Sequence, residues 1–295
     1  MSSSRSITRQ IARNGTRKPV PKAGLLQENE AITTSQFYLL KWIACIAMLI
    51  GNFALFFRYQ CEIPDKIYLP IIYISRFVFP LFAYLTVESF YHTKKRGRHL
   101  LRIAVIALLS EIPYDVMNIT SDDIITFEHQ SPCIALFLGF LCLLATDKGY
   151  ESVSKIYHGN RFGKAVEICI KVNLAGVFLL LAYGLRLEYG FGGVLLVILL
   201  GLARNNKYKH LIQLVAFAVF ALTQRHIAYA CAGIGLVLIY TMEFLAKKNK
   251  DKPAEKNLAQ RFLCSKFTRR FTRIFYPFHM VILIAVRMLM VLSAQ

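Results

Sequence analysis

The chain has 295 residues, of which 56% are hydrophobic, and its mean hydropathy is +0.45. A water-soluble domain cannot bury so large an apolar fraction, so this composition excludes a purely soluble protein. The formal net charge of +19 raises the question of nucleic-acid binding, and the positions of the basic residues along the chain decide it.

The first 36 residues form a basic tail that is rich in Ser, Arg, Pro and Gly and has no hydrophobic periodicity. No small-residue cleavage site follows in signal-peptide fashion, so we expect the tail to stay on the protein. We predict that residues 1–36 are a mobile cytoplasmic segment attracted to anionic headgroups.

Nine apolar stretches follow, and we take each as a candidate membrane span. They are 39–57, 67–90, 100–117, 134–145, 166–184, 191–203, 211–222, 227–246 and 277–292. The stretches 134–145 and 211–222 are shorter than the roughly 20 residues that cross hydrocarbon, so each is either extended by its flanks or re-entrant. Residues 37–295 are therefore predicted to form an all-α, polytopic transmembrane helix bundle of about nine spans.

Most of the 36 Lys and Arg residues lie in the N-terminal tail and near 94–98, 148–164, 204–209 and 247–273, which are alternate connections. This positive-inside pattern predicts an odd number of spans with the N-terminus inside and the C-terminus outside. The basic charge is thus expected to face a lipid bilayer, and no nucleic-acid partner is predicted.

The last basic connection contains a segment with Leu258, Phe262, Phe271 and Phe275 at helical spacing and cations between them. This pattern predicts an interfacial amphipathic helix near 257–275, separated from the eighth span at Pro253. Two readings stay open: simple anchoring to the inner leaflet, or binding of an acidic partner or a nucleotide-bearing donor.

Three polar residues lie inside apolar stretches: Asn52, Arg76 and Glu111. At 1.5 Å per residue all three fall in the middle or outer half of their spans, so they can meet. A bilayer tolerates such groups when they face each other or a cavity, which favours a shared site. The alternative is a buried Arg76–Glu111 pair that only fixes helix register.

Two further charges inside the apolar stretches have structural readings. We expect Glu88 to pair with Lys94, Lys95 or Arg96 near the inner face, and Arg287 to meet a carboxylate across the bundle. The sequence contains no Walker loop, dinucleotide-binding glycine motif, metal-type His pair or nucleophile elbow, so no metal is predicted.

Several short blocks resemble the TraX family, the F-pilin acetylase-like membrane proteins. They are Lys41-Trp-Ile-Ala-Cys-Ile-Ala-Met-Leu-Ile50, Ser75-Arg-Phe-Val-Phe-Pro-Leu-Phe82, Ser110-Glu-Ile-Pro-Tyr-Asp115, Tyr189-Gly-Phe-Gly-Gly193 and Phe275-Tyr-Pro-Phe-His279. The resemblance implies a multi-pass acyltransferase of the bacterial cytoplasmic membrane. It would move an acetyl group from acetyl-CoA, by O- or N-acetyl transfer, to an envelope acceptor such as the amino terminus of a pilin-like peptide.

The chain departs from the family pattern in the first span. An Asp-His pair is expected after the hydrophobic run, and Gly51 and Asn52 stand there instead. An imidazole can act as a general base toward the acceptor, whereas an Asn amide cannot.

The candidate site residues follow from the intramembrane polar groups and the resembling blocks. Glu111, His279 and Asn52 are the catalytic candidates, and Arg76, Asp115, Glu188 and Tyr189 are the candidates for binding substrate or donor. Structural alternatives are an interfacial anchor for His279, a helix cap for Asp115, and a simple turn for Glu188 and Tyr189.

Three functions compete at this point. The first is a membrane acyltransferase with an altered catalytic set. The second is a non-catalytic relative that binds a peptide or lipid, which Gly51-Asn52 favours. The third is a transporter or channel that uses Arg76 and Glu111 as a polar pathway.

Overall fold

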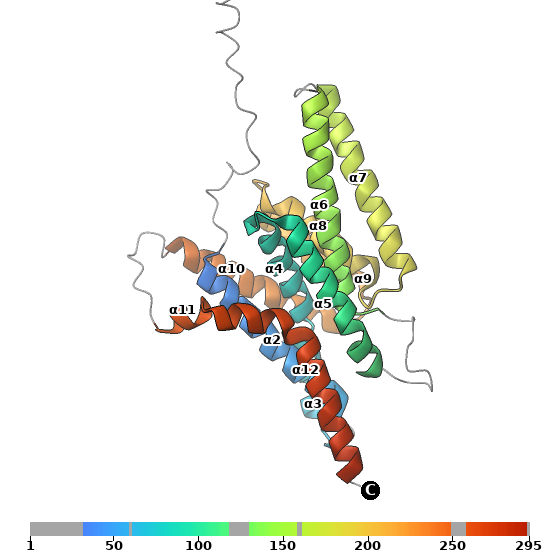
Figure 1. Ribbon diagram of the computed structural model, residues 1–295, viewed down its shortest axis with the longest axis vertical. Coiled ribbons are helices and arrows are strands. Elements are labelled where there is room, and N and C mark those ends of the chain that lie inside the picture. Colours follow the sequence, from blue (N-terminus) through green and yellow to red (C-terminus); the bar gives the residue numbers. More distant parts are fainter. Residues whose placement is uncertain (1–31, 59–60, 118–129, 158–160, 249–257, 294–295) are drawn as a thin grey trace, which may run out of the picture. The chain divides into compact units, whose positions relative to one another are not determined.

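The computed structural model describes residues 32–58, 61–117, 130–157, 161–248 and 258–293. Within these ranges the secondary structure is helical, apart from one isolated bridge between Gln130 and Leu187. The helices are α2 (Thr34–Phe57), α3 (Asp65–Ser75), α4 (Val78–His92), α5 (Arg96–Met117), α6 (Pro132–Tyr157), α7 (Arg161–Gly184), α8 (Gly190–Arg204), α9 (Lys209–Thr223), η1 (Ile227–Cys231), α10 (Ala232–Lys248), α11 (Leu258–Leu263) and α12 (Lys266–Ser293) (Figure 1). The basic tail up to residue 31, and Pro253, lie outside the described residues.

Six segments of the described chain are long and apolar enough to cross a membrane. They are Thr34–Phe57, Asp65–His92, Pro132–Ser152, Phe162–Gly184, Ile227–Lys248 and Lys266–Met290. The helices α8 and α9 are apolar but have only 15 residues each. The all-helical, multi-pass architecture is therefore confirmed, while the number of about nine spans and the inside N-terminus stay predictions.

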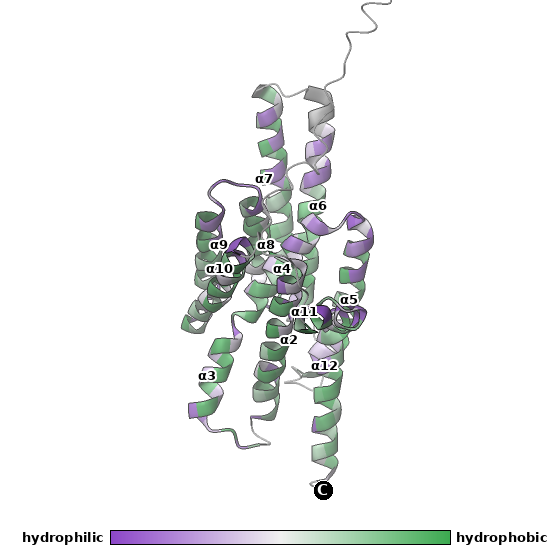
Figure 2. Cartoon of the chain, turned by 90° about the vertical axis from the view of Figure 1, so that its left-hand side faces the viewer, coloured by the Kyte–Doolittle hydropathy of each residue, from purple (hydrophilic) through white to green (hydrophobic). Residues whose placement is uncertain are grey.

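The two short apolar stretches behave differently. The stretch 134–145 is extended by its flanks into α6, which has 26 residues. The stretch 211–222 remains the short helix α9. Figure 2 shows hydrophobic residues along most of the helices and hydrophilic residues toward the upper ends of α6 and α7. Many large apolar side chains are exposed, as expected for surfaces that face lipid.

The core is built around α4, which packs against α2, α6, α8 and α10. Its side chains Leu81, Tyr84, Leu85 and Phe90 are almost completely buried. Small residues allow close helix contacts nearby. A Cβ atom at Gly139 on α6 would lie 2.6 Å from the Val197 side chain on α8, so only glycine fits this contact.

One candidate span, Asp65–His92, is broken between α3 and α4 at Arg76 and Phe77. The backbone N–H of Arg76 caps α3 through the carbonyls of Tyr73 and Ile74. Next to this break, α2 approaches closely at Gly51, where a Cβ atom would lie 2.7 Å from the Ser75 side chain. Asn52 and Arg76 therefore project from neighbouring positions of the backbone.

The last helix, α12, changes direction along its length (Figures 1 and 2). Pro277 lies inside it and removes one backbone hydrogen bond, which is the usual cause of a kink. The amphipathic helix predicted near 257–275 is present as two helices, α11 and the first part of α12. Its location at a membrane surface stays a prediction.

Candidate functional site

A cavity of about 560 Å³ lies between α2, α4, α5 and α12, with further walls from α6 and from the segment between α7 and α8. Its middle is apolar, with Met48, Leu85, Ile103, Leu136 and Phe275 among the lining residues. Polar groups gather in two separate regions. Lys41 lies in the first of these regions and Asn52 lies on the far side of the apolar middle; the two residues are 11 positions apart on α2, or about 16 Å at the helical rise.

The first region is the basic end, which we define by Lys41 on α2, Arg102 on α5 and Arg273 on α12. Within the described residues these three cations form no salt bridge. His99 lies among them, and its Nε2 is 3.0 Å from the Ser89 hydroxyl. Burial, followed by the charges of Lys41, Arg102 and Arg273, lowers the pKa of His99 to about 4. The basic end therefore repels a further positive charge.

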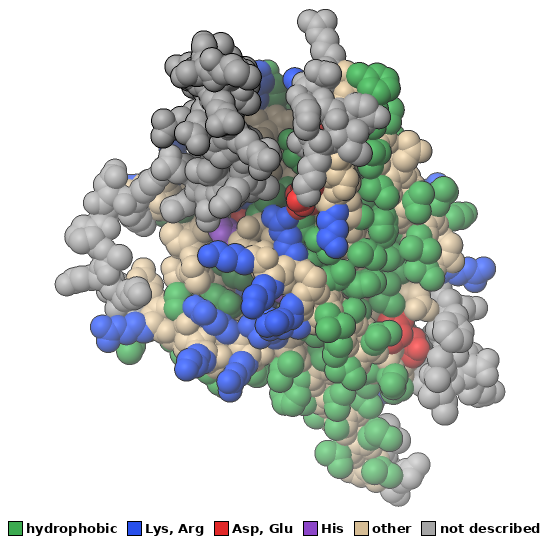
Figure 3. All heavy atoms as spheres, turned by 45° about the horizontal axis from the view of Figure 1, so that its top comes forward, with side chains coloured by type: hydrophobic (Ala, Val, Ile, Leu, Met, Phe, Trp, Pro, Cys, Tyr) green, Lys and Arg blue, Asp and Glu red, His purple; other side chains and the backbone are tan. Residues whose placement is uncertain are grey.

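Exposed cations of α5, α11 and α12 continue the basic end onto the surface of the protein. They include Arg98, Arg261, Lys266, Arg269 and Arg270. Figure 3 shows a face on which Lys and Arg side chains gather, beside an extensive hydrophobic surface.

The second region is the arginine–glutamate end, which contains Arg76, Tyr114, Glu188 and Tyr189. The Glu188 carboxylate accepts a hydrogen bond from Tyr114 and interacts with the charge of Arg76. Burial raises the pKa of Glu188, although Tyr114 and Arg76 act in the opposite direction. The cavity thus holds a carboxyl group whose pKa is raised by burial and which interacts with the charge of an arginine in the same cavity.

The side chain of Arg76 lies between an aromatic ring and the cavity. Its guanidinium lies over the Tyr229 ring, 5.1 Å from the ring centroid. Its Nε is buried and has no hydrogen-bond partner among the described residues. A buried N–H without an acceptor is costly, and such groups are frequent at sites that bind a ligand.

The backbone holds Glu188 in place between α7 and α8. Gln130, just before α6, accepts from the Glu188 N–H at 3.1 Å and donates to the Arg186 carbonyl at 3.3 Å. Tyr189 is fixed next to it, because its ring stacks on Phe79 at 4.0 Å and its carbonyl accepts from the Gln224 side chain at 3.2 Å. These contacts fix the backbone from which the Glu188 side chain projects.

Asn52 and His279 form a third contact, between α2 and α12. The Asn52 Nδ2 is 2.9 Å from His279 Nε2, and His279 Nδ1 is 2.9 Å from the Phe275 carbonyl oxygen. The imidazole is only 2% exposed and stacks on the Phe275 ring at 5.0 Å. Asn52 lines the cavity, and His279 lies behind it.

The remaining candidates lie elsewhere. Both carboxylate oxygens of Glu111 are within hydrogen-bonding distance of the Ser131 N–H, at 3.2 and 3.3 Å, just before α6. Asp115 is buried one helical turn further along α5. Neither lines the cavity. The contacts therefore do not group Glu111 with Asn52 and Arg76 as predicted: Arg76 lines the cavity together with Glu188 and interacts with its charge, and Asn52 contacts His279.

Sequence reasoning missed four cavity residues: Tyr114, Lys41, Arg102 and Arg273. Tyr114 lies within one of the resembling blocks, between Glu111 and Asp115. Arg273 belongs to the basic connection 247–273, which the positive-inside pattern alone explains. The signal that identifies the three cations is their position at the ends of apolar stretches that pack against one another.

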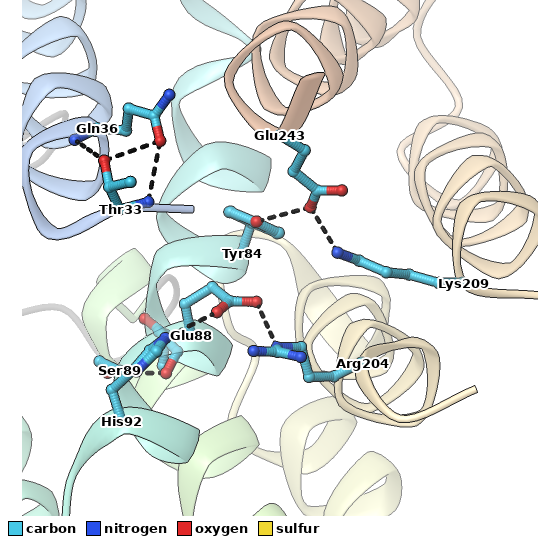
Figure 4. Close-up of polar contacts among 10 residues, drawn as sticks. Thr33, Gln36, Tyr84, Glu88, Ser89, His92, Arg204, Lys209 and Glu243 are labelled. Carbon is cyan, nitrogen blue, oxygen red and sulfur yellow. Dashed lines mark hydrogen bonds and ion pairs between the residues drawn. The ribbon is translucent and has the colours of Figure 1, made fainter. Parts of the chain in front are cut away.

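A separate cluster on the other side of α4 is made of paired charges (Figure 4). The Glu88 carboxylate is 2.8 Å from Arg204 Nε and 3.4 Å from His92 Nε2. Glu243 accepts from Lys209 at 2.7 Å and from the Tyr84 hydroxyl at 2.8 Å. The prediction that Glu88 pairs with Lys94, Lys95 or Arg96 was wrong, because α8 brings Arg204 to it.

These features define a class: a multi-pass α-helical membrane protein with a polar cavity between its helices. A family model described as TraX protein matches residues 36–287. The chain therefore belongs to the TraX family, which confirms the resemblance inferred from the short blocks. Comparisons with curated proteins and with solved structures gave no match.

Proposed function

We propose that this protein is an acyltransferase of the bacterial cytoplasmic membrane that transfers an acetyl group from acetyl-CoA to an amino or hydroxyl group of an envelope acceptor, such as a pilin-like peptide. The observation that carries the proposal is one cavity with two unlike polar regions: three cations that form no salt bridge within the described residues at one end, and an arginine that interacts electrostatically with a carboxyl group at the other. Membership of the TraX family supports the same reaction class.

The basic end fits the phosphate groups of the donor. Lys41, Arg102 and Arg273 are three cations whose charge no carboxylate in the described residues neutralises, and phosphates are their natural partners. The apolar middle of the cavity suits the pantetheine arm, which in extended form bridges a gap of the observed size, about 16 Å along α2. The thioester would then reach the region of Asn52 and Arg76.

At the other end, Glu188 and Arg76 have complementary roles. The acceptor nitrogen or oxygen attacks the thioester carbonyl carbon, and Glu188 takes the proton that the acceptor loses. Arg76 donates hydrogen bonds to the carbonyl oxygen, on which negative charge develops. The carbon–sulfur bond breaks, the sulfur leaves and takes the proton from Glu188, and the products are the acetylated acceptor and free CoA.

This assignment replaces the base that the family pattern expects in the first span. Asn52 cannot accept a proton at neutral pH, whereas the Glu188 carboxylate can. The raised pKa of Glu188 brings it closer to the operating pH, which favours proton transfer. Glu111 and Asp115, which do not line the cavity, have no contact with the reacting groups in this scheme.

The test is transfer of labelled acetyl groups from acetyl-CoA by the purified protein in nanodiscs, with hydroxylamine as a small probe acceptor. Loss of a general base typically costs about 10²- to 10⁴-fold, so Glu188→Gln should reduce kcat by that order. The matched control is Glu167→Gln, because Glu167 on α7 pairs with Lys171 away from the cavity. Equal rates for wild type and Glu188→Gln would remove Glu188 from the reaction.

A second candidate function is binding of a peptide or lipid without chemistry. The observation that favours it is Gly51-Asn52 in place of the expected Asp-His pair. In that case the protein would hold its partner without turnover of acetyl-CoA, and Asn52→His would be the variant in which transfer appears.

A further inference from the structure

The hydrogen bond between His279 and Asn52 indicates which kind of ligand group Asn52 can bind. The reason is that the Phe275 carbonyl determines which nitrogen of His279 is protonated, and this in turn determines how the Asn52 amide is oriented. Both ring nitrogens of His279 have a polar neighbour: Nδ1 is 2.9 Å from the Phe275 carbonyl oxygen, and Nε2 is 2.9 Å from the Asn52 amide nitrogen. A carbonyl oxygen only accepts hydrogen bonds. Nδ1 must therefore carry a proton and donate it to Phe275.

The tautomer of His279 then determines the orientation of Asn52. A neutral imidazole has one N–H, so with Nδ1 protonated its Nε2 is an acceptor. Only the NH₂ group of the Asn52 amide can donate to it, which matches the Nδ2 at 2.9 Å. The reverse orientation of the amide would bring two acceptors together unless the ring carried a positive charge.

The surroundings of His279 argue against that positive charge. The ring is 2% exposed, lies parallel to the Phe275 ring and meets the Tyr276 ring edge-on. Burial of a charged imidazole among apolar groups without an ionic partner is costly. The neutral ring with Nδ1–H and a donating Asn52 amide is thus the arrangement that satisfies every contact.

Since the NH₂ group of Asn52 is bonded to His279, the amide oxygen, Oδ1, is the Asn52 atom that remains for a ligand in the cavity. Asn52 lines the cavity, and within the described residues its Oδ1 makes no hydrogen bond. An amide oxygen accepts hydrogen bonds and cannot donate them. A ligand atom that meets Asn52 must therefore be a hydrogen-bond donor.

We infer that His279 is a positioning residue that acts through Asn52, and that the Asn52 oxygen binds the N–H or O–H group of the acyl acceptor. The binding of the acyl acceptor by Asn52 rests on the proposed function, whereas the positioning role of His279 does not. Gly51 supports the arrangement from the other side, because its close contact with Ser75 fixes the backbone from which Asn52 projects. The imidazole reaches the cavity only through the amide, so His279 takes no proton from the acceptor.

The first experiment measures the tautomer of His279 in the wild-type protein. We would label the protein with ¹³C at the Phe carbonyls and ¹⁵N in His, and use solid-state NMR in lipid at pH 7. The through-space contact between the Phe275 carbonyl and Nδ1 identifies His279 without any variant. We expect a protonated Nδ1 and an unprotonated Nε2. A protonated Nε2 in the wild type would overturn the inference.

A variant tests the same contact from the side of Asn52. Asn52→Asp keeps the size and the oxygen but replaces the NH₂ group by a second acceptor. We expect His279 to gain a proton on Nε2 and become an imidazolium in this variant, because a carboxylate accepts from it. An unchanged His279 spectrum in a folded Asn52→Asp protein would show that the two side chains do not meet.

The ligand class is tested kinetically with hydroxylamine as acceptor and acetyl-CoA as donor. Asn52→Ala removes one hydrogen bond, and we expect the KM for hydroxylamine to rise up to about tenfold while the KM for acetyl-CoA stays unchanged. A rise in the KM for acetyl-CoA alone would assign Asn52 to the donor and overturn this part.

The experiments distinguish a failure of the proposed function from a failure of the inference about His279. A protonated Nδ1 in a protein that transfers no acetyl group would support the role of His279 and contradict the proposed function. A protonated Nε2 in a protein that does transfer acetyl groups would contradict the inference and leave the proposed function in place.

Discussion

The two sides of α4 differ in whether the charged side chains near them form ion pairs. On one side Tyr84 and Glu88 take part in a cluster where carboxylates meet cations: Glu88 meets Arg204, and Glu243 meets Lys209. On the other side α4 contributes Leu85, Thr86 and Ser89 to a cavity whose basic end holds three cations without a salt bridge in the described residues. The protein thus holds paired and largely buried charges on one side of α4, and on the other side cations that form no salt bridge within the described residues.

The presence or absence of an ion-pair partner distinguishes charges with a structural role from charges that can bind a ligand. A buried ion pair compensates the desolvation of both partners and fixes the helices that carry them. Like charges that line one cavity repel one another, so a cluster of cations without a salt bridge in the described residues is a candidate site for an anionic ligand. The comparison predicts that substitutions on the paired side affect folding, while substitutions on the cavity side affect binding and turnover.

The largest effect on folding is expected at Glu88. Glu88→Ala would remove a fully buried carboxylate from Arg204, whose side chain is only 12% exposed, and breaking a buried pair from one side costs about 3–5 kcal/mol. The measurement is the free energy of unfolding in detergent micelles. The control is Glu167→Ala, where the partner Lys171 is half-exposed and the loss should be at most about 0.5 kcal/mol. An equal loss of unfolding free energy in both variants would contradict the claim that the charge cluster beside α4 is structural.

The next effect concerns the basic end. Arg273→Ala should leave the free energy of unfolding unchanged or slightly higher, because one of three mutually repelling cations is removed. The affinity for acetyl-CoA should fall by about ten- to a hundredfold, as expected for a hydrogen bond to a charged group worth about 1.5–3 kcal/mol. Equilibrium binding in nanodiscs measures it. Arg270→Ala is the matched control, since Arg270 is exposed on the same helix and does not line the cavity. Unchanged binding by Arg273→Ala would contradict the role of the basic end.

A smaller effect is expected where α2 meets the break between α3 and α4. Gly51→Asp introduces one residue of the Asp-His pair that the resemblance leads us to expect, but its side chain would collide with Ser75, because even a Cβ atom at this position would lie 2.7 Å from the Ser75 side chain. Overpacking of this kind costs about 1–3 kcal/mol, so the variant should unfold at lower temperature. Gly97→Asp is the control, because a Cβ atom there meets nothing within 4 Å. A Gly51→Asp protein as stable as the wild type would show that the two helices separate easily.

The smallest effect is a shift in titration at His99. Its pKa of about 4 in the folded protein is below the ordinary value of 6.5, so between these values the unfolded chain binds more protons. Stability is therefore present above pH 6.5 and is lost as the pH falls toward 4, and His99→Gln should weaken this pH dependence. Binding of CoA at the basic end should raise the pKa of His99, since phosphates offset the neighbouring cations. NMR titration with and without CoA measures the shift, and an unchanged pKa would indicate that the phosphates bind elsewhere.

The helices could be predicted from the sequence because apolar runs and the residues that bound them are local properties. The partners of the charged groups could not. Glu88 meets Arg204, which is far away in the sequence, because α4 packs against α8, whereas the predicted partners were its sequence neighbours. In the same way depth in the span predicts a meeting of Arg76 with Glu111, whereas the backbone contacts between Gln130 and the segment before α8 place Glu188 in the cavity that Arg76 lines.

The candidate site was predicted in part. Asn52, Arg76, Glu188 and Tyr189 line the cavity, and His279 touches Asn52. The pairing of Asn52 with His279 had no signal in the sequence, because it depends on α2 and α12 packing against each other. Lys41 and Arg102 lie at the ends of apolar runs, where a topological reading of basic residues accounts for them equally well.

The central claim is that one cavity holds the donor between the basic end and the arginine–glutamate end. The most direct measurement is a cryo-electron microscopy structure of the protein in nanodiscs with acetyl-CoA. We predict the phosphates at Lys41, Arg102 and Arg273 and the thioester beside Arg76 and Glu188. Density for the donor on the exposed basic surface of α11 and α12, with an empty cavity, would contradict the claim.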